Sequence, residues 1–395
     1  MKRNPDPTKR RSGRSGVILL SILLVLALLG AFLAFILPAL RGENAGERIA
    51  SAASDEADVS VTAPESEEQT GGRPDLALDS KSRKASEPAK TPGTESEPIR
   101  LLALKGPTAM GAAAWIQNVR RDGDPAYGVP VQATVLAAPD LLPPLIAKGE
   151  YEMALMPTSL AAVLNKKTND GLRFMALSTM SVLHICERGD TVHRLSDLRG
   201  RTIVLSGKGT TPDQILLNVL HSAGLSSDEL SLEYVSEHQA VVQRLAADPT
   251  LVALLPEPFV TVTGTKLPDL RVAIDLNDAW KESHQSGDEA SAIVQGVLVA
   301  RRDWLEANPE LAAKALNAFQ TSTAIAQETP ELAAEAIASL DLFPREVAVK
   351  ALPRCGLTSV SDEKAKQLLR AFLSQLDDEK TPDLSPSFFE NGFTP

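Results

Sequence analysis

Residues 203–220, IVLSGKGTTPDQILLNVL, place an apolar strand-like run before a Gly-Lys-Gly turn and a helix-like run. A nucleotide-binding P-loop needs Ser or Thr directly after its Gly-Lys pair and a second glycine five residues before the first. Here Lys208 is followed by Gly209, and no glycine lies five residues before Gly207. The stretch therefore predicts a strand, a glycine turn and a helix start without a nucleotide site.

The start of that helix carries the residues of a capping box. Thr211, Pro212 and Gln214 fit its N-cap, first and third positions. Such a helix start presents backbone N–H groups and a positive dipole end, which suit an anion or a small polar molecule. The alternative is that Gly207 and Gly209 only permit a tight turn.

Three further strand-like runs end in a comparable way. KGPT (105–108), MPTS (156–159) and PEP (256–258) each follow an apolar run and precede a helix-like one. Strands that alternate with helices indicate a parallel sheet with crossover helices. In open α/β sheets, ligands bind beyond the carboxyl ends of the strands. Two such sheets facing each other would form a cleft between their strand ends.

The chain contains two such series, and we expect each to form one lobe of an α/β fold. Two long β-rich runs, 172–188 and 293–302, would carry the chain from lobe to lobe. Residues 99–182 and 296–395 are assigned to lobe 1, and residues 183–295 to lobe 2. The tail includes an amphipathic helix at 362–376 that would pack on lobe 1.

Four segments resemble the solute-binding proteins of bacterial ABC importers: KGPTAMG, MPTSLAAVLN, LSDLRGRTIVLSGKGTTPDQILLNVL and LLPEPFVTV. The nearest group is the nitrate/sulfonate/taurine and thiamine-precursor type, and the likeness covers most of residues 99–395. The resemblance implies a type II periplasmic-binding-protein fold with two crossover strands. It also implies a small polar or anionic solute in the interlobe cleft, an ABC permease as partner, no cofactor and no catalytic residues.

The family's ligand-contacting loops can be carried over by position. The resemblance then implies a ligand site made of Lys105, Gly106, Pro107, Thr108, Pro157, Thr158, Ser159, Thr179, Gly207, Gly209, Thr210, Thr211 and Glu257. Lys105 would supply a positive charge or lie on the surface. Glu257 would accept a hydrogen bond from the ligand's amine or ring N–H, or bond nearby backbone N–H groups for structure.

The N-terminal region differs from that of a typical relative. Residues 1–16 carry six Lys and Arg against one Asp, and residues 17–40 form an uncharged apolar run long enough to cross a bilayer. We expect a single membrane anchor, with the folded part held outside the cytoplasm by a disordered, Ser/Glu/Pro-rich linker at 41–98. The alternative is a long signal peptide cleaved near residues 50–52.

Composition excludes other classes of function. The chain has 395 residues, a net charge of -11 and 4% aromatic residues, so a nucleic-acid surface is not expected. The five histidines form no zinc motif, and we expect no metal. The EHQ segment at 237–239 is interpreted as a solvated helix face. Cys186 and Cys355 are either a disulfide pair or two buried thiols.

Two other functions stay open at this point. The same scaffold can carry an enzyme that acts on a small metabolite, because a fold does not dictate a function. It can also carry a ligand-sensing module that reports to a membrane partner. Neither alternative has a set of residues in the sequence that supports it.

Overall fold

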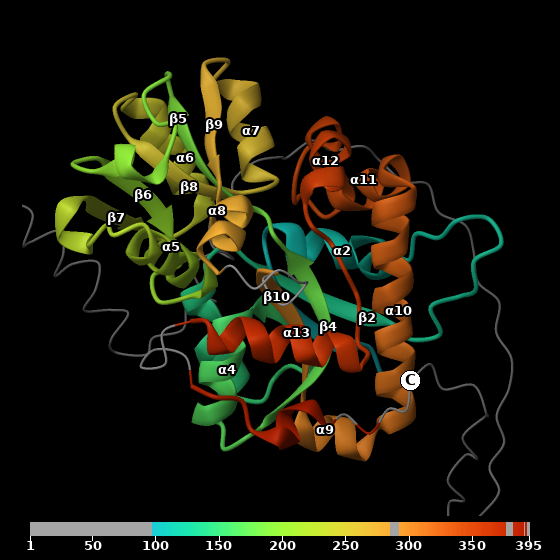
Figure 1. Ribbon diagram of the computed structural model, residues 1–395. Helices are drawn as coiled ribbons and strands as arrows, with labels where there is room; N and C mark the ends of the chain where they lie inside the picture. Colours follow the sequence, from blue (N-terminus) through green and yellow to red (C-terminus); the bar gives the residue numbers. More distant parts are fainter. Residues whose placement is uncertain (1–96, 285–291, 377–381, 391, 393–395) are drawn as a thin grey trace, which may run out of the picture. The chain divides into compact units, whose positions relative to one another are not determined.

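The computed structural model describes residues 97–284, 292–376, 382–390 and 392. Two five-stranded sheets organise this part of the chain, with strand orders β2-β1-β3-β10-β4 and β7-β6-β8-β5-β9 (Figure 1). Residues 1–16, the expected membrane anchor at 17–40 and most of the expected linker at 41–98 lie outside the described residues. In the described part, every helix is too short or too polar to cross a bilayer.

The first sheet and its helices come from both ends of the described chain. The strands are β1 (Ile99–Leu104), β2 (Val131–Leu136), β3 (Met153–Pro157), β4 (Leu172–Met180) and β10 (Val294–Arg301). The helices before the second sheet are α2 (Pro107–Ile116), α3 (Leu142–Ala147) and α4 (Thr158–Lys167), with a 3-10 turn at Pro139–Leu141. Those after β10 are α9 (Arg302–Ala307), α10 (Pro309–Glu328), α11 (Pro330–Ser339), α12 (Arg345–Ala351) and α13 (Glu363–Ser374), with 3-10 turns at Leu352–Arg354 and Pro386–Phe389.

The second sheet is continuous in the sequence. Its strands are β5 (Leu183–Arg188), β6 (Thr202–Ser206), β7 (Ser231–Val235), β8 (Val252–Pro256) and β9 (Leu270–Asp275). Its helices are α5 (Thr211–Ser222), α6 (His238–Ala247), α7 (Phe259–Lys266) and α8 (Leu276–Ser283), with 3-10 turns at Leu195–Leu198 and Ser227–Glu229. We call the first sheet with its helices lobe 1, and the second with its helices lobe 2.

The two sheets share one topology. In each, three neighbouring strands run parallel, and the fourth strand in spatial order runs antiparallel to both of its neighbours: β10 in lobe 1 and β5 in lobe 2. The carboxyl ends of the parallel strands therefore gather at one edge of each sheet. This arrangement confirms the predicted two-lobed α/β fold.

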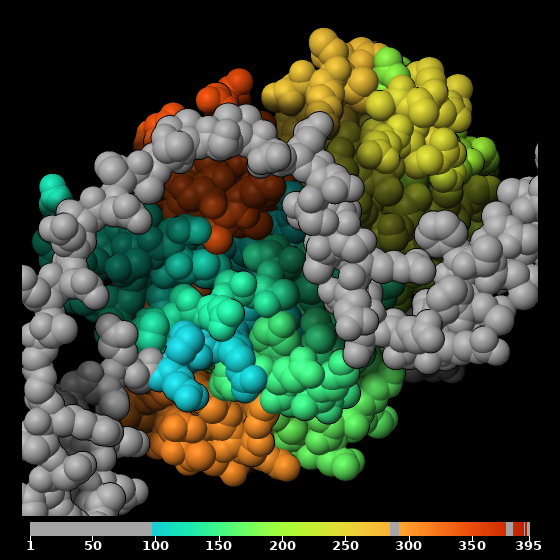
Figure 2. Space-filling view, turned by 180° about the vertical axis from the view of Figure 1, so that it is seen from behind, coloured from blue at the N-terminus to red at the C-terminus, as the bar shows by residue number. Residues whose placement is uncertain are grey.

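The predicted crossover run at 172–188 is divided between the lobes. β4 belongs to the first sheet and β5 to the second, and the chain turns between them at Ser181, whose φ is 47°. β10 lies wholly within the first sheet, so the chain leaves lobe 2 before Val294. In the space-filling view, the residues of lobe 2 are mostly yellow and olive, and those of lobe 1 are mostly teal, green and orange (Figure 2).

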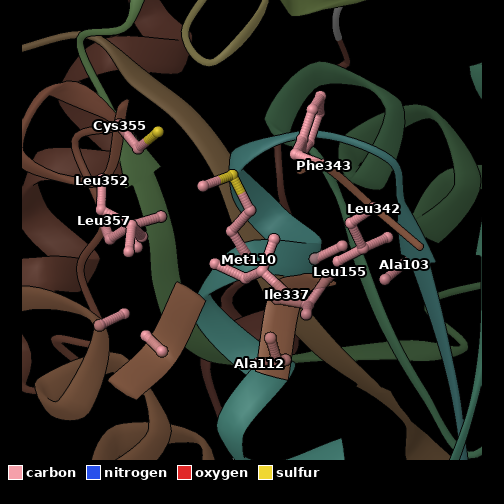
Figure 3. Packing of buried hydrophobic residues seen from close by; sticks show 14 of the residues in the cluster. Ala103, Met110, Ala112, Leu155, Ile337, Leu342, Phe343, Leu352, Cys355 and Leu357 are labelled. Carbon is pink, nitrogen blue, oxygen red and sulfur yellow. The ribbon is translucent and has the colours of Figure 1, made fainter. Parts of the chain in front are cut away.

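The core of lobe 1 forms where α2 meets the tail helices. Met110 of α2 is fully buried, and it lies among Leu352, Leu357 and Ile337 (Figure 3). After α12, residues 356–360 run beside β4: the amide of Met180 donates to the carbonyl oxygen of Gly356 at 2.8 Å, and that of Leu177 to Val360 at 2.9 Å. The C-terminal segment is thus an integral part of lobe 1.

Both cysteines are buried and free. Cys186 lies on β5, and Cys355 follows the turn after α12. Burial raises the pKa of each thiol far above its ordinary value, so both are poor nucleophiles and poor metal ligands. The alternative of two separate buried thiols is therefore the one that the structure has.

Candidate functional site: a cavity between the lobes

The strand ends of the two lobes enclose a small cavity, which we call the interlobe cavity. It is lined by Leu104, Lys105, Gly106, Pro107, Thr108, Pro139, Pro157, Val182, Ser206, Gly207, Thr210, Pro212, His238, Pro256 and Gln295. Its volume is about 60 Å³. Ligand pockets are usually about 300–1,000 Å³, so this cavity fits only a compact molecule unless the lobes separate.

The sequence-predicted residues divide into two groups by their place in the structure. Seven line the interlobe cavity: Lys105, Gly106, Pro107, Thr108, Pro157, Gly207 and Thr210. Six lie elsewhere: Thr158, Ser159, Thr179, Gly209, Thr211 and Glu257. Most of the predicted loops therefore converge as expected, and a ligand role for each residue stays a prediction.

Ser159 and Thr211 contact each other across the lobes. The backbone N–H of Ser159 donates to the hydroxyl oxygen of Thr211 at 2.9 Å, and the Thr211 hydroxyl donates to Ser159 Oγ at 3.2 Å. Both residues are fully buried. Their polar groups are occupied by this contact between α4 and α5 rather than directed into the cavity.

The predicted capping box at the start of α5 is wrong. The N-cap is Thr210, and no side chain caps the helix. Thr211 is instead the first helical residue, and its hydroxyl bonds Ser159 of the other lobe. The Thr210 hydroxyl turns back to donate to the carbonyl oxygen of Gly207 at 2.6 Å.

Glu257 is part of a second contact between the lobes. Its carboxylate accepts from the backbone N–H and the hydroxyl of Thr261, at 3.0 and 2.8 Å, and from Arg354 Nε at 2.8 Å. Glu257 follows β8 of lobe 2, whereas Arg354 follows α12 of lobe 1. Since both carboxylate oxygens are engaged, this geometry favours the structural reading of Glu257 over the ligand-accepting one.

The charged group of Lys105 faces away from the strand ends. Its Nζ donates to the carbonyl oxygen of Asp341 at 3.3 Å and lies 5.7 Å from the centroid of the Phe343 ring. Asp341 and Phe343 belong to the turn between α11 and α12. The ammonium therefore helps to hold this turn against the end of β1.

A partly buried Ser–His pair forms the lobe 2 wall of the cavity. His238 is the first residue of α6, and its Nδ1 lies 2.8 Å from Ser206 Oγ at the end of β6. Burial lowers the pKa of His238 to about 4, so the ring is neutral at pH 7. The prediction that residues 237–239 are a solvated helix face is therefore wrong for His238. The sequence feature that could have pointed to His238 is its position at the start of the helix after β7, at the same sheet edge as Ser206.

Gln295 is the other wall residue that sequence reasoning missed. It lies near the start of β10, is 8% exposed, and its Oε1 has no hydrogen-bond partner within the protein. The next residue, Gly296, lies close to β4 and α2 of the same lobe. A Cβ added there would be 2.9 Å from Ser178 Oγ and 3.2 Å from Thr108 Cγ2. The sequence feature that could have pointed to Gln295 is that it is the one polar residue in the apolar run IVQGVLVA.

Among the described residues, no group of three or more His, Cys, Asp or Glu side chains is placed to hold a metal ion. Hydroxyl, amide and imidazole groups therefore supply the side-chain chemistry of the cavity, with backbone groups of the loops beside them. Groups of these kinds donate and accept hydrogen bonds.

Comparison with solved structures gives the same architecture. An ABC transporter protein from Parabacteroides distasonis superposes with a TM-score of 0.59 at 21% identity, covering 74% of this chain and 98% of that one. The periplasmic aliphatic sulphonate binding protein SsuA of Escherichia coli gives 0.56 at 15% identity, covering 73% and 94%. The alkanesulfonate-binding protein SsuA of Xanthomonas axonopodis, bound to MOPS, gives 0.56 at 13% identity, covering 74% and 96%.

At these identities the likeness establishes the fold and leaves the ligand open. No curated protein matches the chain by sequence. A family model described as NMT1/THI5 like matches residues 128–333, which is more than half of the 395 residues. The resemblance stated from the sequence is thereby confirmed, and the chain belongs to the NMT1/THI5-like family of periplasmic-binding-protein fold.

Proposed function

We propose that this protein is the solute-binding component of an ABC importer and holds one small polar solute in the interlobe cavity. The observation that carries the proposal is the cavity itself, whose wall takes polar side chains from both lobes: Thr108 and Gln295 from lobe 1, Ser206, Thr210 and His238 from lobe 2. A site divided in this way binds its solute fully only when the lobes are together, which couples binding to closure.

The connection between β4 and β5 is the natural hinge for that closure. Ser181 and Val182 join the two sheets, and Ser181 Oγ donates to Asn277 Oδ1 at 2.7 Å. The contacts that must part on opening include two polar pairs, Ser159 with Thr211 and Glu257 with Arg354. They also include two buried aromatic pairs, Phe259 with Phe343 and Trp280 with Phe372. Water replaces the polar partners at small net cost, whereas separating the aromatic pairs exposes apolar surface, which favours the closed arrangement.

The names of the structural neighbours support a function in transport. Several structural neighbours are named as sulfonate-binding or ligand-binding components of ABC systems. We infer a permease in the membrane as the partner of this chain. We further infer that residues 17–40 anchor it to the outer face of that membrane, because this run is apolar and uncharged and follows a basic segment.

An enzyme is the second candidate, because Ser206 and His238 lie within hydrogen-bond distance as a nucleophile and its base would. A general base works best with a pKa near the operating pH. The pKa of His238, about 4, makes it a weak base at pH 7. Binding without turnover is therefore favoured.

Native mass spectrometry of the purified full-length chain tests the proposal. We expect a small molecule to be released intact from the wild-type protein, and less of it from Thr108→Ala and Thr210→Ala, which stay folded although each loses a hydroxyl that donates to a backbone carbonyl oxygen. Both variants lose a hydroxyl at the cavity wall. Steady consumption of the released molecule by fresh protein would instead establish an enzyme.

The anchor requires its own test. We expect the full-length chain to stay with the membrane fraction after alkaline carbonate extraction, and a variant lacking residues 17–40 to be released. A wild-type protein that carbonate releases, or whose mature N-terminus maps near residues 50–52, would favour the cleaved signal peptide.

A further inference from the structure

The charge state of the solute can be read from the groups that wall the interlobe cavity. Of its lining residues, all of them described, only Lys105 carries a charge at pH 7, and its ammonium bonds the turn between α11 and α12. Thr108, Ser206, Thr210, His238 and Gln295 are polar and uncharged. A charged solute would lose its hydration without meeting an opposite charge, which is strongly unfavourable.

Helix starts can bind anions through free backbone N–H groups, but here many of those groups are absent or occupied. Pro107 begins α2 and Pro212 is the second residue of α5, and neither has an N–H. In α4, the N–H of Ser159 already donates to Thr211. In α7, that of Thr261 donates to Glu257.

The first turn of α5 carries a negative charge, and the ammonium of Lys208 in the preceding turn lies over the Tyr234 ring. The Asp213 carboxylate accepts from the N–H of Gly209 at 2.8 Å and from the phenol of Tyr234, also at 2.8 Å. Asp213 is buried, and the N–H of Thr210 is bonded to Gly207. An acidic side chain thus occupies the anion-binding position that the glycine turn at 207–209 suggested in the sequence.

One acceptor in the wall is left without a donor. Gln295 Oε1 is buried and has no hydrogen-bond partner within the protein. A buried polar atom without a partner is unfavourable, and native proteins pair nearly all of them. Since Gln295 lines the interlobe cavity, a solute that donates a hydrogen bond to it would satisfy this atom.

We propose that the interlobe cavity takes a compact, uncharged solute with at least one N–H or O–H donor, and that Gln295 is the residue that accepts from it. The inference deepens the proposed function and rests on it. It assigns to this chain a solute of different charge from the sulfonates for which several of its structural neighbours are named. Gln295 then determines specificity, since an anion with only acceptor atoms would face its unpaired oxygen.

Two pairs of probes of matched shape test the charge: acetamide against acetate, and methanesulfonamide against methanesulfonate. Binding to the full-length chain is measured by ligand-observed NMR at pH 7.5 in Tris, because sulfonate buffers would compete. We expect the uncharged member of each pair to bind at least about tenfold more tightly. Tighter binding of the anions would overturn this inference and leave the proposed function standing.

Substitution of Gln295 tests the contact itself. We expect Gln295→Leu to weaken binding of the uncharged probes about tenfold or more, without lowering the melting temperature of the free protein, because the lost oxygen has no partner in the protein. Gln295→Asn is the matched control: it keeps an uncharged amide acceptor on a shorter side chain and should retain more of the binding than Gln295→Leu does. Unchanged affinity in Gln295→Leu would remove Gln295 from the site.

The failure of the proposed function has a separate signature. In that case neither member of either pair would bind, and native mass spectrometry of the wild-type chain would release no small molecule. A released molecule with a permanent charge, by contrast, would overturn only the inference about charge.

Discussion

The contacts between the lobes and the wall of the interlobe cavity both use polar side chains, yet they differ in pairing. In the contacts, Ser159 bonds Thr211 and Glu257 bonds Arg354, so the polar groups have partners. In the cavity wall, Gln295 Oε1 has none. Gln295 therefore keeps an acceptor free for a solute, whereas the hydroxyls of Thr108 and Thr210 already donate to nearby backbone carbonyl oxygens.

The largest expected effect is a pH dependence of the free energy of unfolding, caused by His238 in the cavity wall. The pKa of His238 is about 4 in the folded protein and near 6.5 in the unfolded chain, so only the unfolded chain takes up this proton between those values. The free energy of unfolding should therefore fall by about 3 kcal/mol as the pH drops from 6.5 to below 4. Urea unfolding at stepped pH measures it.

The matched variants for this prediction are His238→Asn and His221→Asn. His221 is exposed on α5, so its replacement should leave the pH dependence unchanged. His238→Asn should flatten the curve between pH 6.5 and 4.5, above the range in which most carboxylates titrate. If the wild type and His238→Asn fall in parallel, His238 is not the neutral group that the structure shows.

A somewhat smaller effect is expected from breaking the charged contact between the lobes. Arg354→Leu leaves the Glu257 carboxylate buried without its cation. Removing one partner of a fully buried pair costs about 3–5 kcal/mol; since the Arg354 side chain is 57% exposed, we expect about 2 kcal/mol. The shift of the urea midpoint at constant slope measures this loss.

The double variant Arg354→Leu with Glu257→Gln controls for the buried charge. We expect it to recover part of the lost stability, because the neutral amide no longer needs the guanidinium. A double variant no more stable than Arg354→Leu would show that the arginine acts through packing alone.

The smallest effect is expected at the neutral contact. Thr211→Val keeps the shape of the side chain and removes the acceptor of the Ser159 N–H, and we expect a loss of about 1 kcal/mol. Thr265→Val is the control, since Thr265 is exposed and its hydroxyl bonds a carbonyl oxygen of its own helix. Equal losses in the two variants would mean that the interlobe hydrogen bond contributes nothing measurable.

Local pattern was sufficient to predict the sheets. The strand-like runs at 99–105, 131–137 and 151–157 became β1, β2 and β3 to within two residues. β3 is buried over its whole length, whereas the edge strand β2 is only partly buried. The amphipathic run at 362–376 likewise became α13. The turn at Ser181 was missed because a short break leaves the apolar pattern on either side intact.

The site was predictable only as a set of converging loops. That Thr211 bonds Ser159 rather than capping its own helix depends on a residue 52 positions away, and the partner of Glu257 lies 97 positions away. Rules based on neighbouring residues cannot predict contacts between residues so far apart in the sequence. Gln295 was missed for the opposite reason: its significance lies in a partner that it lacks, which only the three-dimensional structure reveals.

Five of the residues that line the cavity are prolines: Pro107, Pro139, Pro157, Pro212 and Pro256. Their rings fix the backbone torsion φ before any guest arrives, so the walls lose little conformational entropy on binding. Rigid walls also adjust poorly to a guest that is one methylene too long. An importer supplied by this receptor would accordingly have a narrow substrate specificity, with close analogues excluded because of their shape.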